Sequence, residues 1–258
     1  MPYLIESNNE LMALNELIRI IIRKGEKNGN YFELLNCLLT IDYNRTDWMD
    51  YCKFIDNIIA IGGAITRHGW KKATLVYTTL RDRQAKPSYL KRLVQYPDKP
   101  RKLSKITTIN QLKKIAYELS SKPGLSNLSF VIFRPSDLYD LFRPGYVPCP
   151  IAGDFKFRHG KLYLNVMFRT CDALAVAFAD IYYLRKLQLD VLELSKKIST
   201  CDLIKNGEPG QLSLYFSRSY IEKNKRIKDK TVSYSIDTMG IVEELLKEIK
   251  KKTKLKKQ

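Results

Sequence analysis

One stretch of alternating apolar and polar residues constrains the fold of this chain more than any other. From Asp154 to Thr170 the sequence reads DFKFRHGKLYLNVMFRT, and the alternation continues on both sides of the pair His159 and Gly160. A period of two residues is typical of a strand with one buried face, and a short turn between two such runs indicates a β-hairpin. We therefore expect two antiparallel strands over these residues.

Helical and strand patterns flank this hairpin. Apolar residues recur at helical spacing in five stretches, which predict helices over 9–24, 47–60, 107–121, 172–198 and 237–252. Asn8 or Asn9 is expected to cap the first of these helices, and a threonine the third. Apolar runs predict strands over 73–80, 128–135 and 210–221, whereas the Lys-, Arg- and Pro-rich stretch 83–106 predicts a long irregular connection. The order of these elements favours an α+β fold.

The composition indicates one soluble globular domain. The 258 residues suffice for one substantial core, and 45% of them are apolar while 28% are charged. No apolar run is long enough to cross a bilayer, and charges interrupt the N-terminal stretch, unlike a secretory signal. We therefore expect a cytoplasmic protein without a membrane partner. The five cysteines are scattered and only two histidines are present, which disfavours a disulfide framework and a histidine-rich metal site.

The basic residues concentrate at the C-terminus. The formal net charge is +18, and lysine-rich runs occupy 223–230 and 250–257. Such runs are typical of a solvated helix end or tail, and they also attract anionic substrates or RNA, because bound cations release counterions from phosphates. We expect one domain over 1–222 with an N-terminal helical elaboration, followed by a basic helix and tail over 223–258 that could bind nucleic acid.

A constellation of residues around the predicted hairpin is the main indication of function. Its members follow one another in this order: Arg134, Pro135, Asp137, Leu138, Pro148, Cys149, Arg169, Thr170, Asp172 and Asp180. The order resembles the central region of thymidylate synthases and of the related pyrimidine-nucleotide hydroxymethylases. In that family a proline and the nucleophilic cysteine precede a hairpin, and an Arg-Ser-x-Asp motif follows it, here RTCD. The likeness covers roughly residues 109–184 and, more loosely, 210–224.

The resemblance implies a fold, a chemistry and partners. It implies a thymidylate-synthase-like mixed sheet with flanking helices, assembled as a homodimer, with 5,10-methylenetetrahydrofolate as cofactor. Cys149 would be the nucleophile, because a thiolate that adds reversibly to C6 of a pyrimidine makes C5 able to attack a one-carbon electrophile. Arg169 would lie near the sulfur and bind the substrate phosphate, and Thr170 would donate a hydroxyl to that phosphate. Asp172 would hold the pyrimidine carbonyl, largely through its backbone.

Asp180 distinguishes the pyrimidine bases within this resemblance. Thymidylate synthases carry asparagine at this place, whereas deoxycytidylate hydroxymethylases carry aspartate, whose carboxyl group can share a proton with N3 of cytosine. A cytosine nucleotide is therefore favoured over a uracil nucleotide. Apart from the surrounding motif, the simpler interpretation of Asp180 is a helix cap, and that of Cys149 is a small buried residue in a Pro-flanked turn.

The sequence departs from the family pattern at several positions. Asn127 and Leu128 stand where the family has paired phosphate-binding arginines, which reach across the dimer interface. Val176 stands where the family has a glycine in the turn that faces the folate, and Asp154 takes the place of a glutamine as a candidate substrate-binding residue. The phosphate grip and the folate site are therefore the parts of the resemblance with the least support.

The sugar-binding and general-base residues also lack a direct match. The family's His-x-Tyr is replaced either by Ser213 and Tyr215 or by Tyr220 and Glu222, and these two registers stay open. Two weak matches, to the catalytic glutamate and to an N-terminal phosphate-binding arginine, are Glu33 in FELLNCLL and Arg45.

The function implied by these residues is one-carbon transfer to C5 of a pyrimidine nucleotide. Hydroxymethyl transfer is favoured over methyl transfer, because cytosine is the favoured base. Two alternatives stay open. In the first, the enzyme acts on a nucleoside, a modified nucleotide or a base within a larger molecule. In the second, the chain is a non-catalytic relative that binds nucleotide or nucleic acid through its pocket and its basic surface.

Overall fold

The structure, a computed structural model, describes residues 2–61, 64–82, 87–98, 107–140 and 147–222. These residues form two compact units. The first comprises the chain up to Lys71, the segment Thr170–Ile181 and the chain from Phe216 onward, and the second comprises Lys72–Arg169 and Tyr182–Tyr215. Three elements contribute to both units: α3 (Ala64–Thr78), α6 (Ala177–Ile198) and β10 (Glu208–Glu222).

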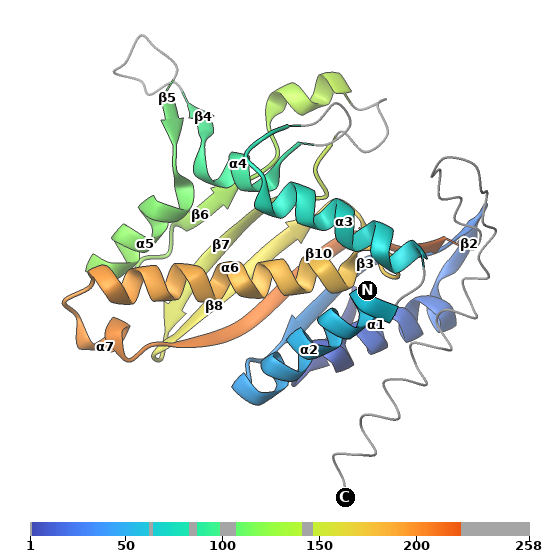
Figure 1. The fold of residues 1–258 in the computed structure, drawn as a ribbon, viewed down its shortest axis with the longest axis horizontal. Helices are drawn as coiled ribbons and strands as arrows, with labels where there is room; N and C mark the ends of the chain where they lie inside the picture. Colours follow the sequence, from blue (N-terminus) through green and yellow to red (C-terminus); the bar gives the residue numbers. More distant parts are fainter. Residues whose placement is uncertain (1, 62–63, 83–86, 99–106, 141–146, 223–258) are drawn as a thin grey trace, which may run out of the picture. The chain divides into compact units, whose positions relative to one another are not determined.

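The strands pair into one mixed sheet of eight, in the order β1-β3-β10-β8-β7-β6, with β2 joined to β3 and β9 joined to β10. A separate pair consists of β4 and β5. Parallel and antiparallel neighbours both occur, and helices flank the strands (Figure 1). The expected α+β fold class with a mixed sheet is therefore confirmed.

In the first unit, a parallel strand pair is joined by a helix. Strand β1 (Tyr3–Ser7) pairs with β3 (Tyr31–Ile41), and α1 (Glu10–Lys24) makes the crossover that parallel neighbours require. Asn9 caps α1, because its side chain accepts a hydrogen bond from the amide of Met12. The unit also contains β2 (Glu26–Asn28), α2 (Arg45–Ile61) and β9 (Cys171–Asp172).

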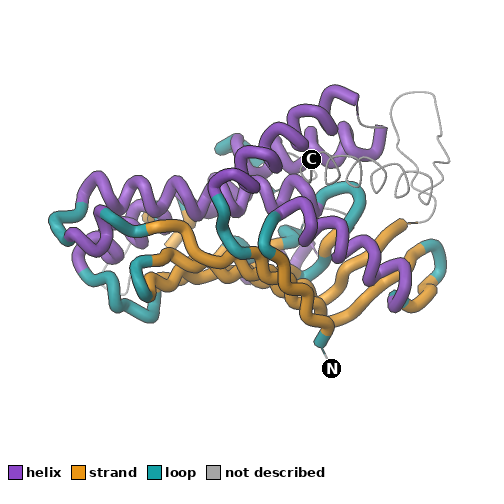
Figure 2. Tube along the Cα trace, turned by 90° about the horizontal axis from the view of Figure 1, so that it is seen from below, coloured by secondary structure: helices purple, strands orange, loops and turns teal. Residues whose placement is uncertain are grey.

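In the second unit, the predicted hairpin is present. Strands β7 (Pro150–Arg158) and β8 (Lys161–Phe168) pair in antiparallel fashion, with His159 and Gly160 at positive φ in the turn. The long helix α6 lies along one face of these strands (Figures 1 and 2), and buried Gln188 joins the layers by donating to the carbonyl of Leu162. The remaining elements are α4 (Tyr89–Val94), β4 (Tyr96–Asp98), β5 (Thr107–Ile109), α5 (Gln111–Ser121), β6 (Leu128–Val131), the 3-10 helix η1 (Pro135–Asp140) and α7 (Asp202–Lys205).

Several local predictions are wrong. The stretch 73–80 belongs mostly to helix α3, although its β-branched residues favour a strand. Thr78 and Thr79 donate their hydroxyls to carbonyls one turn earlier in the chain, which reconciles threonine with helical geometry. The connection 83–106 is not wholly irregular, since it contains α4 and β4. Asn110, and not a threonine, caps α5.

The N-terminal segment supplies strands as well as helices. FELLNCLL, the stretch around Glu33 that weakly matched the family's catalytic glutamate, lies within strand β3, and its buried residues follow neither a strict strand nor a helical period. Two other helices begin close to where they were expected, α2 at Arg45 and α6 at Ala177. The basic region 223–258, with the helix expected over 237–252, lies outside the described residues.

Candidate active site at the Cys149 end of the hairpin

Cys149 lies immediately before strand β7, at the end of the hairpin opposite the turn. Its backbone is held on two sides: the carbonyl accepts a hydrogen bond from the amide of Arg169 over 2.8 Å, and the amide donates to the hydroxyl of Tyr89 over 3.2 Å. The residue is half-buried and its thiol forms no disulfide. This arrangement fixes the backbone of Cys149 while leaving part of the residue accessible.

Arg169 faces Cys149 from the neighbouring strand. The register pairs Pro150 with Phe168, so that Arg169 follows β8 where Cys149 precedes β7. The exposed Arg169 side chain turns back and donates from Nη2 to the carbonyl of Val147 over 3.3 Å. The structure therefore brings together the predicted nucleophile and the predicted cation.

Arg134 approaches the same end of the strands from the other side of β7. Strand β6 pairs with β7 in antiparallel fashion, and the amides of Ile132 and Phe133 both donate to the carbonyl of Ile151, at 2.8 and 3.0 Å. Arg134 follows β6, and Cys149 precedes β7, at the same end of these two paired strands. The segment that carries Cys149 lies between two segments that each carry an arginine.

A row of tyrosines supports Cys149 from the helical layer, and sequence reasoning missed it. The ring of Tyr89 packs edge to face on Tyr77 with centroids 5.1 Å apart, and Tyr77 stacks on Tyr183 at 4.8 Å. The Tyr183 hydroxyl shares a hydrogen bond with that of Thr74 over 2.9 Å. Burial raises the pKa of Tyr183 above its ordinary value. The only sequence signal was the recurrence of tyrosine, which also fits an ordinary core.

The RTCD motif continues into the first unit, where Asp172 organises the start of α6. Its Oδ1 accepts a hydrogen bond from the amide of Ala175, and its carbonyl accepts one from Val176. In the register of β9 with β10, Asp172 pairs with Tyr220. Asp172 therefore has a structural role as a cap. In one of the two candidate sugar-binding registers the tyrosine is Tyr220, which lies beside the RTCD motif.

Two hydroxyls in this region are buried without a hydrogen-bond partner among the described residues. They are Oγ1 of Thr170 and Oγ of Ser219. Ser219 pairs with Cys171, the residue after Thr170, in the register of β9 with β10. A buried hydroxyl without a partner costs free energy, so a ligand or water that accepts from Thr170 would stabilise the site. The phosphate contact of Thr170 stays a prediction.

Asp180 is almost completely buried in the first turn of α6, with 3% of its surface exposed. Beside it, the hydroxyl of Tyr51 donates to the carbonyl of Phe178 over 2.8 Å. Burial raises the pKa of Tyr51 well above its ordinary value, and the negative charges of Glu10, Cys52 and Asp180 raise it further. Asp180 thus lies in an enclosed, acid-rich environment of the first unit, where a carboxyl group needs a proton or a donor.

The other predicted site residues lie elsewhere. Asp154 is in the middle of β7 and forms an ion pair with Lys156 over 2.5 Å. Tyr215 is half-buried in β10, on the opposite face of the strand from buried Leu214 and Phe216. Arg45 is exposed at the start of α2.

Glu33 belongs to a polar cluster that sequence reasoning did not find. Its carboxylate accepts from Asn28 over 2.7 Å and from Arg218 over 2.5 Å, and both hydrogen bonds lower the pKa of Glu33, with Asn28 as the larger cause. The Arg218 guanidinium also lies over the rings of Tyr31 and Tyr220, at 5.1 and 4.6 Å. Glu33 therefore serves as an ion-pair partner between strands β3 and β10.

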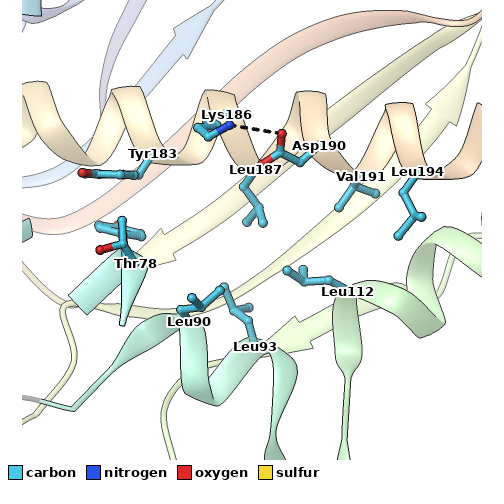
Figure 3. Close-up of a pocket in the computed structure, with 11 residues that line it drawn as sticks. Thr78, Leu90, Leu93, Leu112, Tyr183, Lys186, Leu187, Asp190, Val191 and Leu194 are labelled. Atoms are coloured by element: carbon cyan, nitrogen blue, oxygen red, sulfur yellow. Dashed lines mark hydrogen bonds and ion pairs between the residues drawn. The ribbon is translucent and has the colours of Figure 1, made fainter. Parts of the chain in front are cut away.

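The two described features that bear on the folate give the predicted cofactor no support. Val176, at the place of the family's glycine, is half-buried, and its carbonyl accepts from the amides of Ala179 and Asp180. One hollow of the second unit has a volume of about 220 Å³. It is smaller than the roughly 300–1,000 Å³ of typical ligand pockets. It is lined by apolar and aromatic side chains with one ion pair at its rim (Figure 3), namely Tyr77, Thr78, Leu90, Leu93, Leu112, Tyr183, Lys186, Leu187, Asp190, Val191 and Leu194.

Neither a metal-binding group, nor a membrane-spanning helix, nor a matching family identifies the function of the described residues. The described residues contain no group of three or more His, Cys, Asp or Glu side chains that could hold a metal ion. No helix within the described ranges combines the length and apolar character needed to span a membrane. Comparison with models of protein families and with curated proteins finds no match to this chain.

Proposed function

We propose that this protein acts at C5 of a pyrimidine nucleotide through a covalent adduct of Cys149 at C6. The observation that carries the proposal is the setting of Cys149. Its backbone is held by Arg169 and Tyr89, and its segment lies between segments that carry Arg134 and Arg169. A partly accessible thiol with the Arg169 guanidinium bound to the carbonyl of Val147, two residues before it, has surroundings that can favour a thiolate nucleophile.

The chemistry that these residues can support is addition followed by exchange. The Cys149 thiolate forms a bond to C6, and the electron pair of the C5–C6 double bond moves toward C5 and, through C4, toward N3 of cytosine. C5 then takes a proton from solvent. Loss of the original C5 hydrogen as a proton and elimination of the thiolate restore the aromatic base, so the net change is isotope exchange at C5. No co-reactant is needed for this part of the reaction.

Two further residues support a cytosine nucleotide as substrate. Asp180 is buried in the first turn of α6, and its carboxyl group is of the type that could share a proton with N3 of cytosine. Thr170 has a buried hydroxyl that lacks a partner among the described residues and could donate to a phosphate oxygen. Asp172, Tyr215 and Tyr220 stay candidates for contacts with the base and the sugar.

The second half of the proposal is group transfer. A methylenetetrahydrofolate donor would supply the one-carbon unit, and hydroxymethyl transfer is the favoured outcome with cytosine. Because Val176 and the small hollow do not fit a folate, we derive no step through this cofactor. A homodimeric, cytoplasmic enzyme of nucleotide metabolism is part of the same proposal.

A non-catalytic function is the second candidate, and Val176, which stands at the place of the family's folate-facing glycine, favours it. In this case the chain binds nucleotide or nucleic acid through the arginines near Cys149 and through its basic residues, which give a net charge of +18. RNA binding of this kind would weaken steeply with salt.

The experiment that separates the two candidates is tritium release from C5-labelled dCMP, CMP and dUMP, without added folate. The proposed enzyme releases tritium fastest from a cytosine nucleotide. No release from any of the three, together with tight and strongly salt-dependent RNA binding, would favour the non-catalytic function.

A further inference from the structure

Arg134 belongs to a buried cluster in the second unit that the predicted chemistry does not use. Its neighbour Arg92, on α4, is 4% exposed and forms a bidentate ion pair with Asp137, which is 2% exposed. Arg92 also donates to the carbonyl of Ile132 over 2.9 Å. The ion pair therefore ties α4 to the end of β6 and to η1, next to Arg134.

The carboxylate of Asp137 has little capacity left for the Arg134 guanidinium. It accepts two hydrogen bonds from Arg92 and a third from the backbone amide of Arg134 over 2.8 Å. The guanidinium of Arg134 instead lies over the ring of Tyr96, with its central carbon 5.4 Å from the ring centroid. The charge of Asp82 also acts on both guanidiniums, but Asp82 is paired with Lys91 over 2.7 Å. Three cations and two carboxylates leave the cluster with one excess positive charge.

The donors of this cluster are incompletely used. The buried Nε atoms of Arg92 and Arg134 find no hydrogen-bond partner among the described residues. Burial, and next the positive charge of Arg92, lower the pKa of Arg134. A buried donor without a partner and an excess positive charge are both relieved when an oxyanion binds. The cluster therefore has the properties of an anion site.

The position of the cluster relates its anion to the candidate active site. Arg134 follows β6 at the end of the strands where Cys149 precedes β7. This placement follows from the amides of Ile132 and Phe133, which both donate to the carbonyl of Ile151. An anion held by Arg134 would thus lie at the Cys149 end of the strands. The paired arginines of the family would lie at the opposite end of β6, where Asn127 and Leu128 stand instead, so Arg134 is the described arginine that follows β6 at the Cys149 end.

We propose that Arg134, positioned by the Arg92–Asp137 ion pair and by Tyr96, binds the phosphate monoester of the substrate. A guanidinium can donate two parallel hydrogen bonds to a phosphate, which makes arginine better suited than lysine to this contact. The inference rests on the proposed function only in assigning the phosphate to a pyrimidine nucleotide. The anion site itself is independent of any reaction at Cys149.

The test measures binding of inorganic phosphate and of dCMP by calorimetry, with deoxycytidine as the ligand that lacks a phosphate. Arg134→Gln is compared with Arg158→Gln, which removes the same charge from the exposed far end of β7. Arg134→Gln should weaken binding of phosphate and of dCMP by about tenfold or more, as expected for the loss of a charge-assisted hydrogen bond. Binding of deoxycytidine should be unchanged, and Arg158→Gln should bind all three ligands like the parent.

Equal phosphate affinity in Arg134→Gln and Arg158→Gln would overturn the inference. If Arg134→Gln does not fold, Arg134→Lys decides, because lysine keeps the charge without the planar fork: weaker phosphate binding supports the site, and unchanged binding contradicts it. Failure of the proposed function gives a different result, namely Arg134-dependent phosphate binding without isotope exchange at C5. Exchange that depends on Cys149 but not on Arg134 would remove only the phosphate site.

Discussion

The backbone amide of Arg169 donates to the carbonyl of Cys149 over 2.8 Å, and the Arg169 guanidinium donates to Val147, two residues before Cys149. Arg169 thus holds the cysteine segment by main chain and side chain together. A residue that both fixes a nucleophile and supplies a positive charge near it affects the reaction more than the fold.

Arg169→Gln should therefore reduce isotope exchange at C5 strongly while changing stability little. The lost contact to Val147 is a half-exposed hydrogen bond, worth about 1 kcal/mol. Loss of a cation that stabilises a reacting anion typically lowers a rate by about 100-fold or more. Thermal unfolding and exchange rates, measured on the same preparations, check both statements. An unfolding midpoint that drops sharply together with the rate would assign Arg169 a structural role only.

The cysteines should differ in reactivity. Burial raises the pKa of Cys37 to about 12, so at pH 8 only about one molecule in 10⁴ carries a Cys37 thiolate. Cys149 is half-buried, and the Arg169 guanidinium donates to the carbonyl of Val147, two residues before it. Iodoacetamide at pH 8, followed by peptide mass spectrometry, should modify Cys149 well before Cys37. Labelling of Cys37 first would contradict the burial of β3.

Asp180→Asn should shift the choice of base from cytosine toward uracil. An amide cannot share a proton with N3 of cytosine as a protonated carboxyl can, but it can pair with the uracil edge. The ratio of exchange rates for dCMP and dUMP should fall by about tenfold or more. Asp190→Asn, on an exposed turn of the same helix, serves as the control. An unchanged ratio in Asp180→Asn would remove Asp180 from base recognition.

Glu33→Gln should make stability less sensitive to acid. The folded-state pKa of Glu33 is lowered, so its contribution to stability is present above the unfolded value of about 4.3 and is lost as the pH falls through the folded value. The urea midpoint of the parent should therefore fall more steeply between about pH 5 and pH 3 than that of Glu33→Gln. Glu6→Gln, at an exposed position of β1, should keep the slope of the parent. Parallel slopes in all three proteins would contradict the role assigned to the Glu33–Arg218 pair.

Local patterns in the sequence predicted the centre of the fold well. The alternation over 154–170 predicts the hairpin because each strand buries one face, and the turn is set by residues that tolerate positive φ. Helix α1 was equally predictable from its periodic apolar face and its asparagine cap. In these segments local preference and tertiary packing agree.

The failures occur where packing overrides local preference. The residues over 73–80 favour a strand by type, yet they continue a helix whose Gly69 lies so close to the backbone of Ala175 that a Cβ there would overlap the carbonyl oxygen. Strand β3 was missed because exposed Leu35 and Asn36 interrupt its alternation, and Asn36 has a positive φ. Neither feature can be read from the residue types alone.

The candidate site was predictable in part. The resemblance implied that Arg169 lies near Cys149, and the structure has the two residues flanking the hairpin at its open end. The contacts of Tyr89 and the Arg92–Asp137 pair join residues 60 and 45 positions apart, and no periodicity signals such pairs. Long-range polar contacts of this kind depend on how the helices pack on the sheet.

The most direct test of the account is deuterium uptake at C5 of a cytosine nucleotide in D₂O, followed by NMR without added folate. The parent should exchange, Cys149→Ser should exchange at the background rate, and Cys201→Ser, which alters another half-buried thiol, should match the parent. Exchange by Cys149→Ser at the rate of the parent would contradict the central claim that this sulfur adds to the pyrimidine ring.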